Sequence, residues 1–412
     1  MMPRRSWRVS RMQSFPNLKD KKPVRYAILA ILALLAALSL YQGVRNALLY
    51  SQDLQWDAAK ALMMRLDPYE LSQTGQDLSE YPELAEFYRM FADRGLTQKM
   101  EANQFPSLLY LLAPMTVFPP DTARVVWIVL NLMFTAGIVF LLKKTFFEDS
   151  DAFMFAVIML VMIAGTPYRN QLGVGQHTLF SFFFFMLAVY ADRKLKKDDI
   201  RGTVAISGCL AVSYFKYTLT APLTLYFIYR KRYKEIAISA AVHVILTGVA
   251  SASLGKSFIY MIKAPLEVAS VLSAEGGIDL GVYLSSPFSY IAALAVGIVL
   301  LWMSLRFPEN NDNVLFPVLI LWSLVLTYHR TYDFFVLSAV AMLFVPGRIG
   351  TGGRSEDILK YWYILVIFIM YFVLRMFAES DTSKICAAVV YYAFAVAVTA
   401  VGIRLIKEKN NG

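Results

Sequence analysis

The chain has 412 residues, of which 58% are hydrophobic and 17% are charged, and its formal net charge is +10 at pH 7. One water-soluble core cannot hide so much apolar surface, so the composition excludes an ordinary soluble protein and indicates that lipid is the solvent. The basic residues gather at the ends of apolar runs, where they orient membrane proteins, and not in a patch typical of nucleic-acid binding. We therefore expect no nucleic-acid partner.

Apolar runs recur between Tyr26 and Arg404, separated by short charged stretches. In a bilayer such runs form helices, because a helix satisfies its own backbone hydrogen bonds. The sequence therefore predicts an all-α polytopic integral membrane protein with about 11 to 13 membrane-embedded helical segments. The expected membrane domain is residues 26–403, and no inverted repeat typical of secondary transporters is visible in it.

The distribution of basic residues predicts the topology. Residues 1–25 hold eight Lys and Arg against the single acid Asp20, and the tail of residues 404–412 is also basic. Because positively charged flanks stay inside, both termini are expected in the cytoplasm, in a protein of the bacterial plasma membrane. No small-residue cleavage site closes the first apolar run, which favours a retained helix over a signal peptide.

Two segments depart from simple spans. Residues 46–103 form the longest polar segment and are more acidic than basic, so they should form a loop on the outer face. Residues 104–120 are apolar but short and carry Pro106 and Pro114, so we expect them to be re-entrant or interfacial. Lys216 lies between two short apolar runs, which predicts a broken helix that lines a cavity.

The start of the polar segment carries an acid close to the membrane surface, Asp53. Residues 58–62 favour a short helix along that surface, with Trp56 and Tyr69 suited to headgroup depth. An aspartate before a helix commonly caps it. The sequence leaves open whether Asp53 is such a cap or a functional carboxylate.

Four cationic side chains fall at the expected outer ends of other helices, namely Arg169, Lys216, His329 and Arg330. Each alone could be ion-paired or snorkelling, but four on one side suit a phosphate ligand. Scattered acids and two histidines do not make a metal site, and no nucleotide-binding motif occurs, so we expect no metal or nucleotide cofactor. The candidate substrate-binding side chains are Gln55, Asp57, Gln176, His177, Tyr332 and Asp333.

Several of these residues lie in stretches that resemble the motifs of glycosyltransferase family 87. The stretch from Asp53 to Tyr69 resembles the pattern that opens the family's outer loop, and Lys216 resembles its lysine at a broken helix. The other matching stretches are Phe105, Pro106 and Pro114, then Gly173 to Leu179 (GVGQHTL), and Tyr328 to Asp333 (YHRTYD).

The resemblance implies a GT-C-type membrane enzyme. Such an enzyme would transfer a sugar, most often mannose, from a polyprenyl-phosphate sugar to a glycolipid or cell-envelope glycan on the outer face. Asp53 would act as general base on the acceptor hydroxyl, and the cations would stabilise the departing phosphate. A single displacement implies inversion at the anomeric carbon. The alternative is a lipid or solute transporter or flippase with the same cationic cavity, and the long outer loop favours the enzyme.

Overall fold

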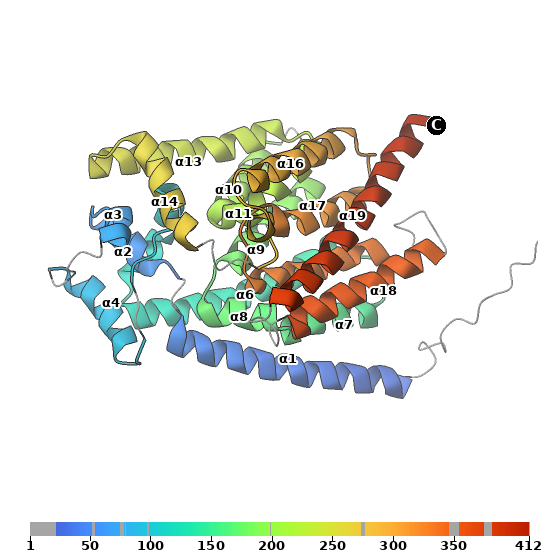
Figure 1. Ribbon diagram of the computed structural model, residues 1–412, viewed down its shortest axis with the longest axis horizontal. Helices are drawn as coiled ribbons and strands as arrows, with labels where there is room; N and C mark the ends of the chain where they lie inside the picture. The colour runs from blue at the N-terminus through green and yellow to red at the C-terminus, as the bar shows by residue number, and fades with distance from the viewer. Residues whose placement is uncertain are drawn as a thin grey trace, which may run out of the picture.

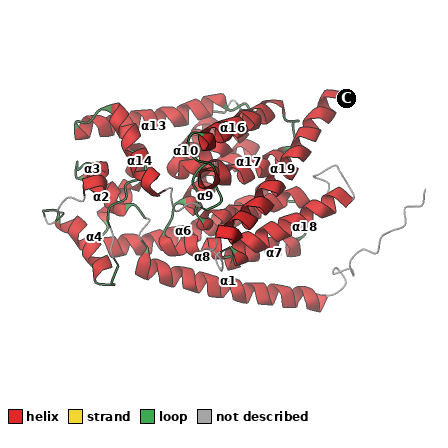
Figure 2. Cartoon of the chain, in the orientation of Figure 1, coloured by secondary structure: helices red, strands yellow, loops and turns green. Residues whose placement is uncertain are grey.

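The structure is a computed structural model. It describes residues 22–51, 54–74, 78, 80–96, 99–197, 199–272, 277–345, 354–374 and 381–411. Every regular element in these residues is a helix, and none is a strand (Figure 2). The predicted all-α class is confirmed.

Five of the described helices are long and apolar enough to cross a membrane. They are α1 (Lys22–Tyr50), α6 (Pro120–Thr145), α13 (Tyr233–Leu254), α16 (Phe288–Arg306) and α19 (Asp381–Asn411). A sixth span results if α7 (Ala152–Ala164) and α8 (Thr166–Val174), which meet at an angle of 52°, are taken as one bent helix. Large apolar side chains are exposed on several of these helices, as lipid contact requires. The chain is a polytopic membrane protein.

Shorter helices lie between these spans. Most residues of α17 (Asp312–Leu326) and of the 3₁₀ segment η5 (Thr331–Phe344) are buried. A helix that is apolar all round belongs inside a bundle, so these two need not reach across the bilayer. Other short helices are α9 (Thr178–Lys194), α10 (Ile200–Ser213), α11 (Tyr217–Leu223), α12 (Leu225–Tyr229), α15 (Leu280–Tyr283), α18 (Arg354–Phe368) and the π-helical turn η6 (Ile369–Val373).

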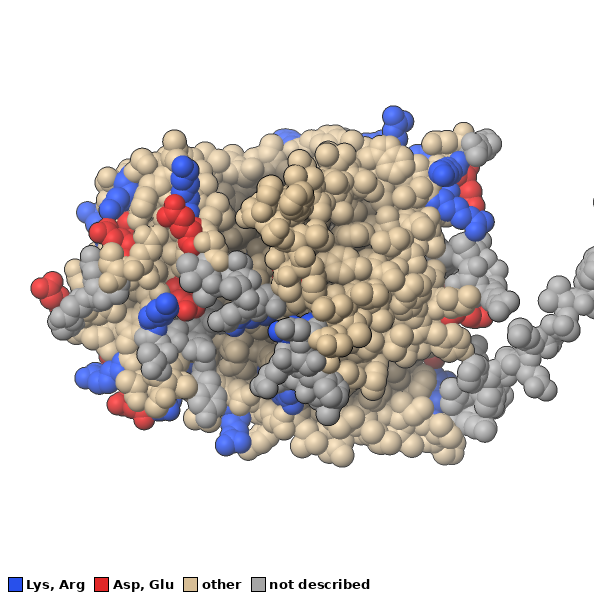
Figure 3. Space-filling model, viewed as in Figure 1, with Lys and Arg blue, Asp and Glu red and all other residues tan. Residues whose placement is uncertain are grey.

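Basic helix ends meet at one end of the molecule. Arg193, at the end of α9, pairs with Asp312 and also donates to the carbonyl of Thr145, at the end of α6. Arg25, near the start of α1, pairs with Asp151 at 2.7 Å. The start of α1 and the C-terminal end of α19 lie at this end (Figure 1), and charged side chains gather mainly toward the two ends of the face in Figure 3. This arrangement agrees with the predicted topology, in which both basic termini lie on one side of the membrane, and the assignment of that side to the cytoplasm stays a prediction.

The opposite end carries the polar segment, folded as α2 (Trp56–Met63), α3 (Pro68–Thr74) and α4 (Pro82–Ala92) (Figure 1). The rings of Trp56 and Tyr69, which were expected at headgroup depth, are both buried in protein, so their depth in the bilayer stays a prediction. Trp56 Nε1 donates to the Met115 carbonyl at 3.2 Å, and the Tyr69 hydroxyl donates to the Gln104 carbonyl at 2.7 Å. Each ring can be buried whole because its polar atom finds a backbone acceptor inside.

The segment expected to be re-entrant or interfacial is a short apolar helix, α5 (Pro106–Leu112), continued by the 3₁₀ turn η2 (Ala113–Val117). It packs against α2, and the two share a hydrophobic core with α14 (Phe258–Leu272). The polar segment and α5 therefore form one folded unit. Its depth in the bilayer stays a prediction.

Candidate active site

A tight turn between α8 and α9 positions the first site residues. Gly175 ends α8 with a φ of +76°, a left-handed conformation that favours glycine. A Cβ atom at Gly175 would lie 2.2 Å from Ser51 Oγ, so a side chain there would require the Ser51 hydroxyl to move. The Gly175 carbonyl accepts a 2.8 Å hydrogen bond from Trp127 Nε1. The turn is thereby fixed, and Gln176 and His177 follow it directly.

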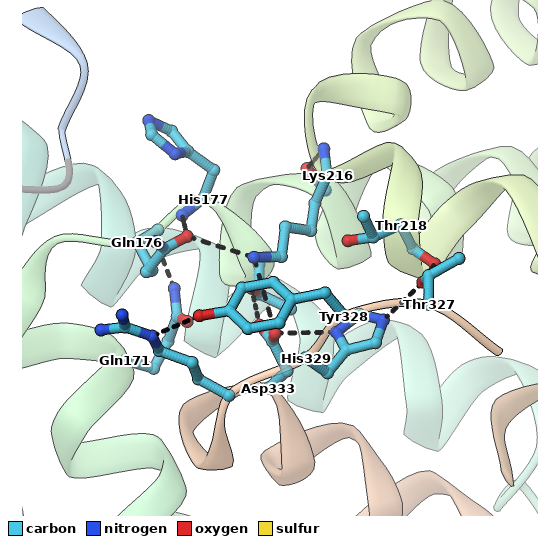
Figure 4. A network of polar contacts seen from close by, with 12 residues as sticks. Gln171, Gln176, His177, Lys216, Thr218, Thr327, Tyr328, His329 and Asp333 are labelled. Carbon is cyan, nitrogen blue, oxygen red and sulfur yellow. Dashed lines mark hydrogen bonds and ion pairs between the residues drawn. The ribbon is translucent and has the colours of Figure 1, made fainter. Parts of the chain in front are cut away.

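Lys216 lies at the predicted helix break, which the structure confirms as the 3₁₀ turn η3 (Tyr214–Lys216) between α10 and α11. Its backbone N–H donates to Ser181 Oγ at 2.8 Å. Its Nζ atom lies 3.5 Å from Asp333 Oδ2 and 3.5 Å from Gln176 Oε1 (Figure 4). Lys216 is only 9% exposed, so two other elements hold a buried ammonium group in place.

Asp333 is the centre of this network and is fully buried. Its Oδ1 accepts a hydrogen bond from the Thr178 hydroxyl. Its Oδ2 lies 2.8 Å from His329 Nδ1, and because a carboxylate only accepts, His329 carries its proton on that nitrogen (Figure 4). A carboxylate is stable at such depth only when it is paired and hydrogen-bonded, as Asp333 is. We define the Lys216 network as Lys216, Asp333, His329, Thr178 and Gln176.

The stretch before η5 adds aromatic and cationic groups beside the network. Lys216 Nζ lies 5.4 Å from the centre of the Tyr332 ring, within the range of a cation–π contact. Arg330 Nε donates to the Tyr328 hydroxyl at 2.5 Å. Residues 328–333 therefore bring a guanidinium, an imidazole, a carboxylate and two phenol rings close to the broken helix.

The four predicted phosphate-binding cations are not all gathered in one place by the contacts of the structure. Lys216 and His329 share Asp333, and Arg330 contacts Tyr328. Arg169 instead donates from Nη1 to Gln42 Oε1 on α1, at 2.7 Å. A phosphate role stays a prediction for each of the four.

Two contacts tie the polar segment to the network. His177 Nε2 lies 3.0 Å from the carbonyl oxygen of Leu54, the residue after Asp53. The ring centres of Phe105 and Tyr217 lie 5.1 Å apart, and Tyr217 follows Lys216. Asp53 itself lies outside the described residues, so its roles as base or cap stay predictions, although the N-cap of α2 is Gln55.

Two other predicted substrate-binding residues lie inside the polar segment. Gln55 Nε2 donates to the Glu101 carbonyl at 3.0 Å. Asp57 Oδ2 accepts a 2.6 Å hydrogen bond from the Tyr88 hydroxyl. Burial raises the pKa of Asp57 to about 6, and the hydrogen bond from Tyr88 partly offsets that rise. Direct contact of these side chains with a substrate stays a prediction.

The structure adds polar residues that the sequence did not single out. Thr178 and Ser181 lie one turn apart at the start of α9, and they bond Asp333 and the Lys216 backbone. Their spacing of three, directly after GVGQH, could have indicated that they share a face. Among the described residues, no three His, Cys, Asp or Glu side chains come close enough together to hold a metal ion.

The comparison with known families assigns this chain. The model of glycosyltransferase family 87 matches residues 106–346, more than half of the chain. The match includes the turn after Gly175, Lys216 and residues 328–333, and it begins after the stretch from Asp53 to Tyr69. No curated protein and no solved structure shows a match. The chain therefore belongs to glycosyltransferase family 87 and is a membrane glycosyltransferase.

Proposed function

We propose that the protein transfers a sugar, mannose by preference, from a polyprenyl-phosphate sugar to a glycolipid or cell-envelope glycan acceptor on the outer face of the membrane. The observation that carries this proposal is the Lys216 network, a buried ammonium and imidazole at a broken helix. A fixed ammonium group beside an imidazole suits a lipid phosphate, whose negative charge grows as it leaves the sugar.

Asp53 is the proposed general base. An acceptor hydroxyl must lose its proton as its oxygen bonds to the anomeric carbon, and a carboxylate can take that proton. The contact of His177 with Leu54 supports this role, because it ties the residue next to Asp53 to the turn that also carries Gln176. The sugar–phosphate bond breaks in the same step, its electron pair leaves on the phosphate, and the anomeric configuration inverts.

The test uses the full chain reconstituted in lipid vesicles. Radiolabelled polyprenyl-phosphate mannose, glucose and arabinose are offered in turn, with a membrane-lipid extract as acceptor. We expect wild type to consume one donor, Asp53→Asn to lose that activity, and Asp93→Asn, an exposed acid in the same segment, to keep it. A folded Asp53→Asn variant with wild-type turnover, or a product of retained configuration, would contradict the mechanism.

A further inference from the structure

Two buried glutamines, Gln55 in the polar segment and Gln104 directly after it, have side-chain oxygens whose hydrogen-bonding capacity is unused within the described residues. Gln55 and Gln104 are each only 8% exposed, and the Oε1 atom of each accepts no hydrogen bond from the residues that the structure places. Burying an acceptor without a donor costs free energy, so each such atom is a candidate to receive a donor from a bound water or a ligand, and these two of the nine such atoms among the described residues lie near one turn.

The orientation of each amide follows from its other atom. Gln55 Nε2 donates to the Glu101 carbonyl at 3.0 Å, and Gln104 Nε2 donates to Asn103 Oδ1 at 3.2 Å. Because the nitrogens take the acceptors, the oxygens are the atoms left to receive donors. A second cost falls on Gln55, whose φ of +58° lies in the left-handed region that non-glycine residues rarely adopt.

The side chains of the two glutamines meet at one turn, residues 101–104. The Glu101 carbonyl accepts from Gln55 Nε2 and also from the backbone N–H of Asn103, at 2.8 Å. Gln104 follows Asn103, and its own carbonyl is held by the Tyr69 hydroxyl. The head of the Gln55 side chain therefore meets the same short turn, residues 101–104, that carries Gln104.

Gln55 and the turn are joined, through their neighbours in sequence, to residues that adjoin the Lys216 network. Gln55 follows Leu54, whose carbonyl contacts His177, and Gln104 precedes Phe105, whose ring packs on Tyr217. A sugar bonded directly to a phosphate has its hydroxyls within about one ring diameter of that phosphate, and hydroxyl groups are the donors that amide oxygens accept.

We propose that Gln55 and Gln104 recognise the sugar of the donor, each amide oxygen accepting a hydrogen bond from a ring hydroxyl while the Lys216 network holds the phosphate. The inference rests on the proposed function and assigns the specificity for the sugar to the turn at residues 101–104. A hexose, with hydroxyls around its ring, is the substrate class that fits two such acceptors.

The test measures binding of two lipids to the full chain in lipid nanodiscs. One is a short-chain prenyl phosphate, and the other is the same lipid carrying mannose. We expect Gln55→Gly and Gln104→Leu each to weaken binding of the mannosyl lipid about tenfold and to leave binding of the bare prenyl phosphate unchanged. Lys216→Met should weaken both, and Gln73→Leu, an exposed amide in the same segment, should weaken neither.

Thermal unfolding separates recognition from structure. Gln55→Gly suits the left-handed backbone and Gln104→Leu removes an acceptor without a donor, so both variants should unfold at or above the wild-type temperature. If the variants unfold at lower temperatures and bind the mannosyl lipid as wild type does, this inference is wrong and the proposed function stands. The same holds if the variants bind both lipids more weakly by the same factor. If wild type binds neither lipid, the proposed donor site fails, and this inference fails with it.

Discussion

His177 Nε2 lies 3.0 Å from the carbonyl oxygen of Leu54, across 123 residues of sequence. Since a carbonyl only accepts, the imidazole carries a hydrogen on Nε2 in this contact. The centre of the His177 ring also lies 4.2 Å from the centre of the Phe215 ring, and Phe215 directly precedes Lys216. One buried side chain thus connects the polar segment to the helix break that carries the ammonium group.

Replacing His177 with phenylalanine tests whether this connection serves activity. The variant keeps an aromatic ring against Phe215 and loses only the hydrogen bond to Leu54. We expect kcat/KM to fall at least tenfold, about 1.4 kcal/mol in transition-state free energy, because the chain next to Asp53 is no longer held. Steady-state kinetics in vesicles measures this, and a folded variant with wild-type kcat/KM would show that the contact is only structural.

The pair of Lys216 and Asp333 should respond differently to single and double substitution. Lys216→Met leaves the buried Asp333 carboxylate without its ammonium partner, and removing one partner of a buried pair costs about 3 to 5 kcal/mol. Adding Asp333→Asn should restore much of the unfolding temperature, since no uncompensated carboxylate then remains. The double variant should still be inactive, and transferase activity in it would argue against a phosphate-binding role of Lys216.

The raised pKa of Asp57 leads us to expect that the stability of the folded protein depends on pH. Its pKa is raised to about 6 in the folded protein, from an ordinary value of 3.8. The folded state therefore binds the proton more tightly, so stability is greatest below about pH 4, falls as the pH rises to about 6 and is level above it. The expected loss is about 3 kcal/mol, and it should appear as a lower unfolding temperature.

Asp57→Asn should flatten the profile between pH 4 and pH 6, because the amide does not titrate. Tyr88→Phe should shift the descending part to higher pH, since the Tyr88 hydroxyl stabilises the ionised form. Thermal unfolding of the three proteins across this range is the measurement. Identical slopes in wild type and Asp57→Asn would assign the dependence to other groups.

Gly175→Ala should disturb the turn after α8 in two separable ways. The new Cβ meets Ser51 Oγ at 2.2 Å, and the left-handed φ costs about 1 kcal/mol for a residue with a side chain. We expect a lower unfolding temperature and reduced activity, because Gln176 and His177 follow this turn. Adding Ser51→Ala should recover only part of the loss, and full recovery would mean that the backbone conformation contributes nothing.

Local patterns were enough to predict much of the fold. The break at Lys216 was visible because two short apolar runs flank it, and the all-α class followed from lipid as the solvent. The burial of Trp56 and Tyr69 was not predictable, because their acceptors, the carbonyls of Met115 and Gln104, lie far along the chain. An aromatic residue near a membrane surface looks the same in sequence whether it faces headgroups or protein.

The sequence likewise indicated some residues of the candidate site and not how they contact one another. Lys216, His329 and Asp333 stood out because charged groups are rare in apolar surroundings. Their grouping around one carboxylate, and the turning of Arg169 toward Gln42, depend on side-chain directions that spacing does not fix. Gln104 was overlooked, because an amide where a polar segment meets an apolar run carries no signal until the donors around it are known.

The core shared by α2, α5 and α14 has a consequence for biosynthesis. Its residues Met261 and Ala264 are made about two hundred positions after Trp56, and α6 to α13 are made between them. The polar segment must therefore wait, with apolar surface uncovered, until α14 has been synthesised after α13. A ribosome that stalls before residue 258 would leave a protein with α1, α6 and α13 already made and the apolar face of the polar segment uncovered, a natural substrate for proteases.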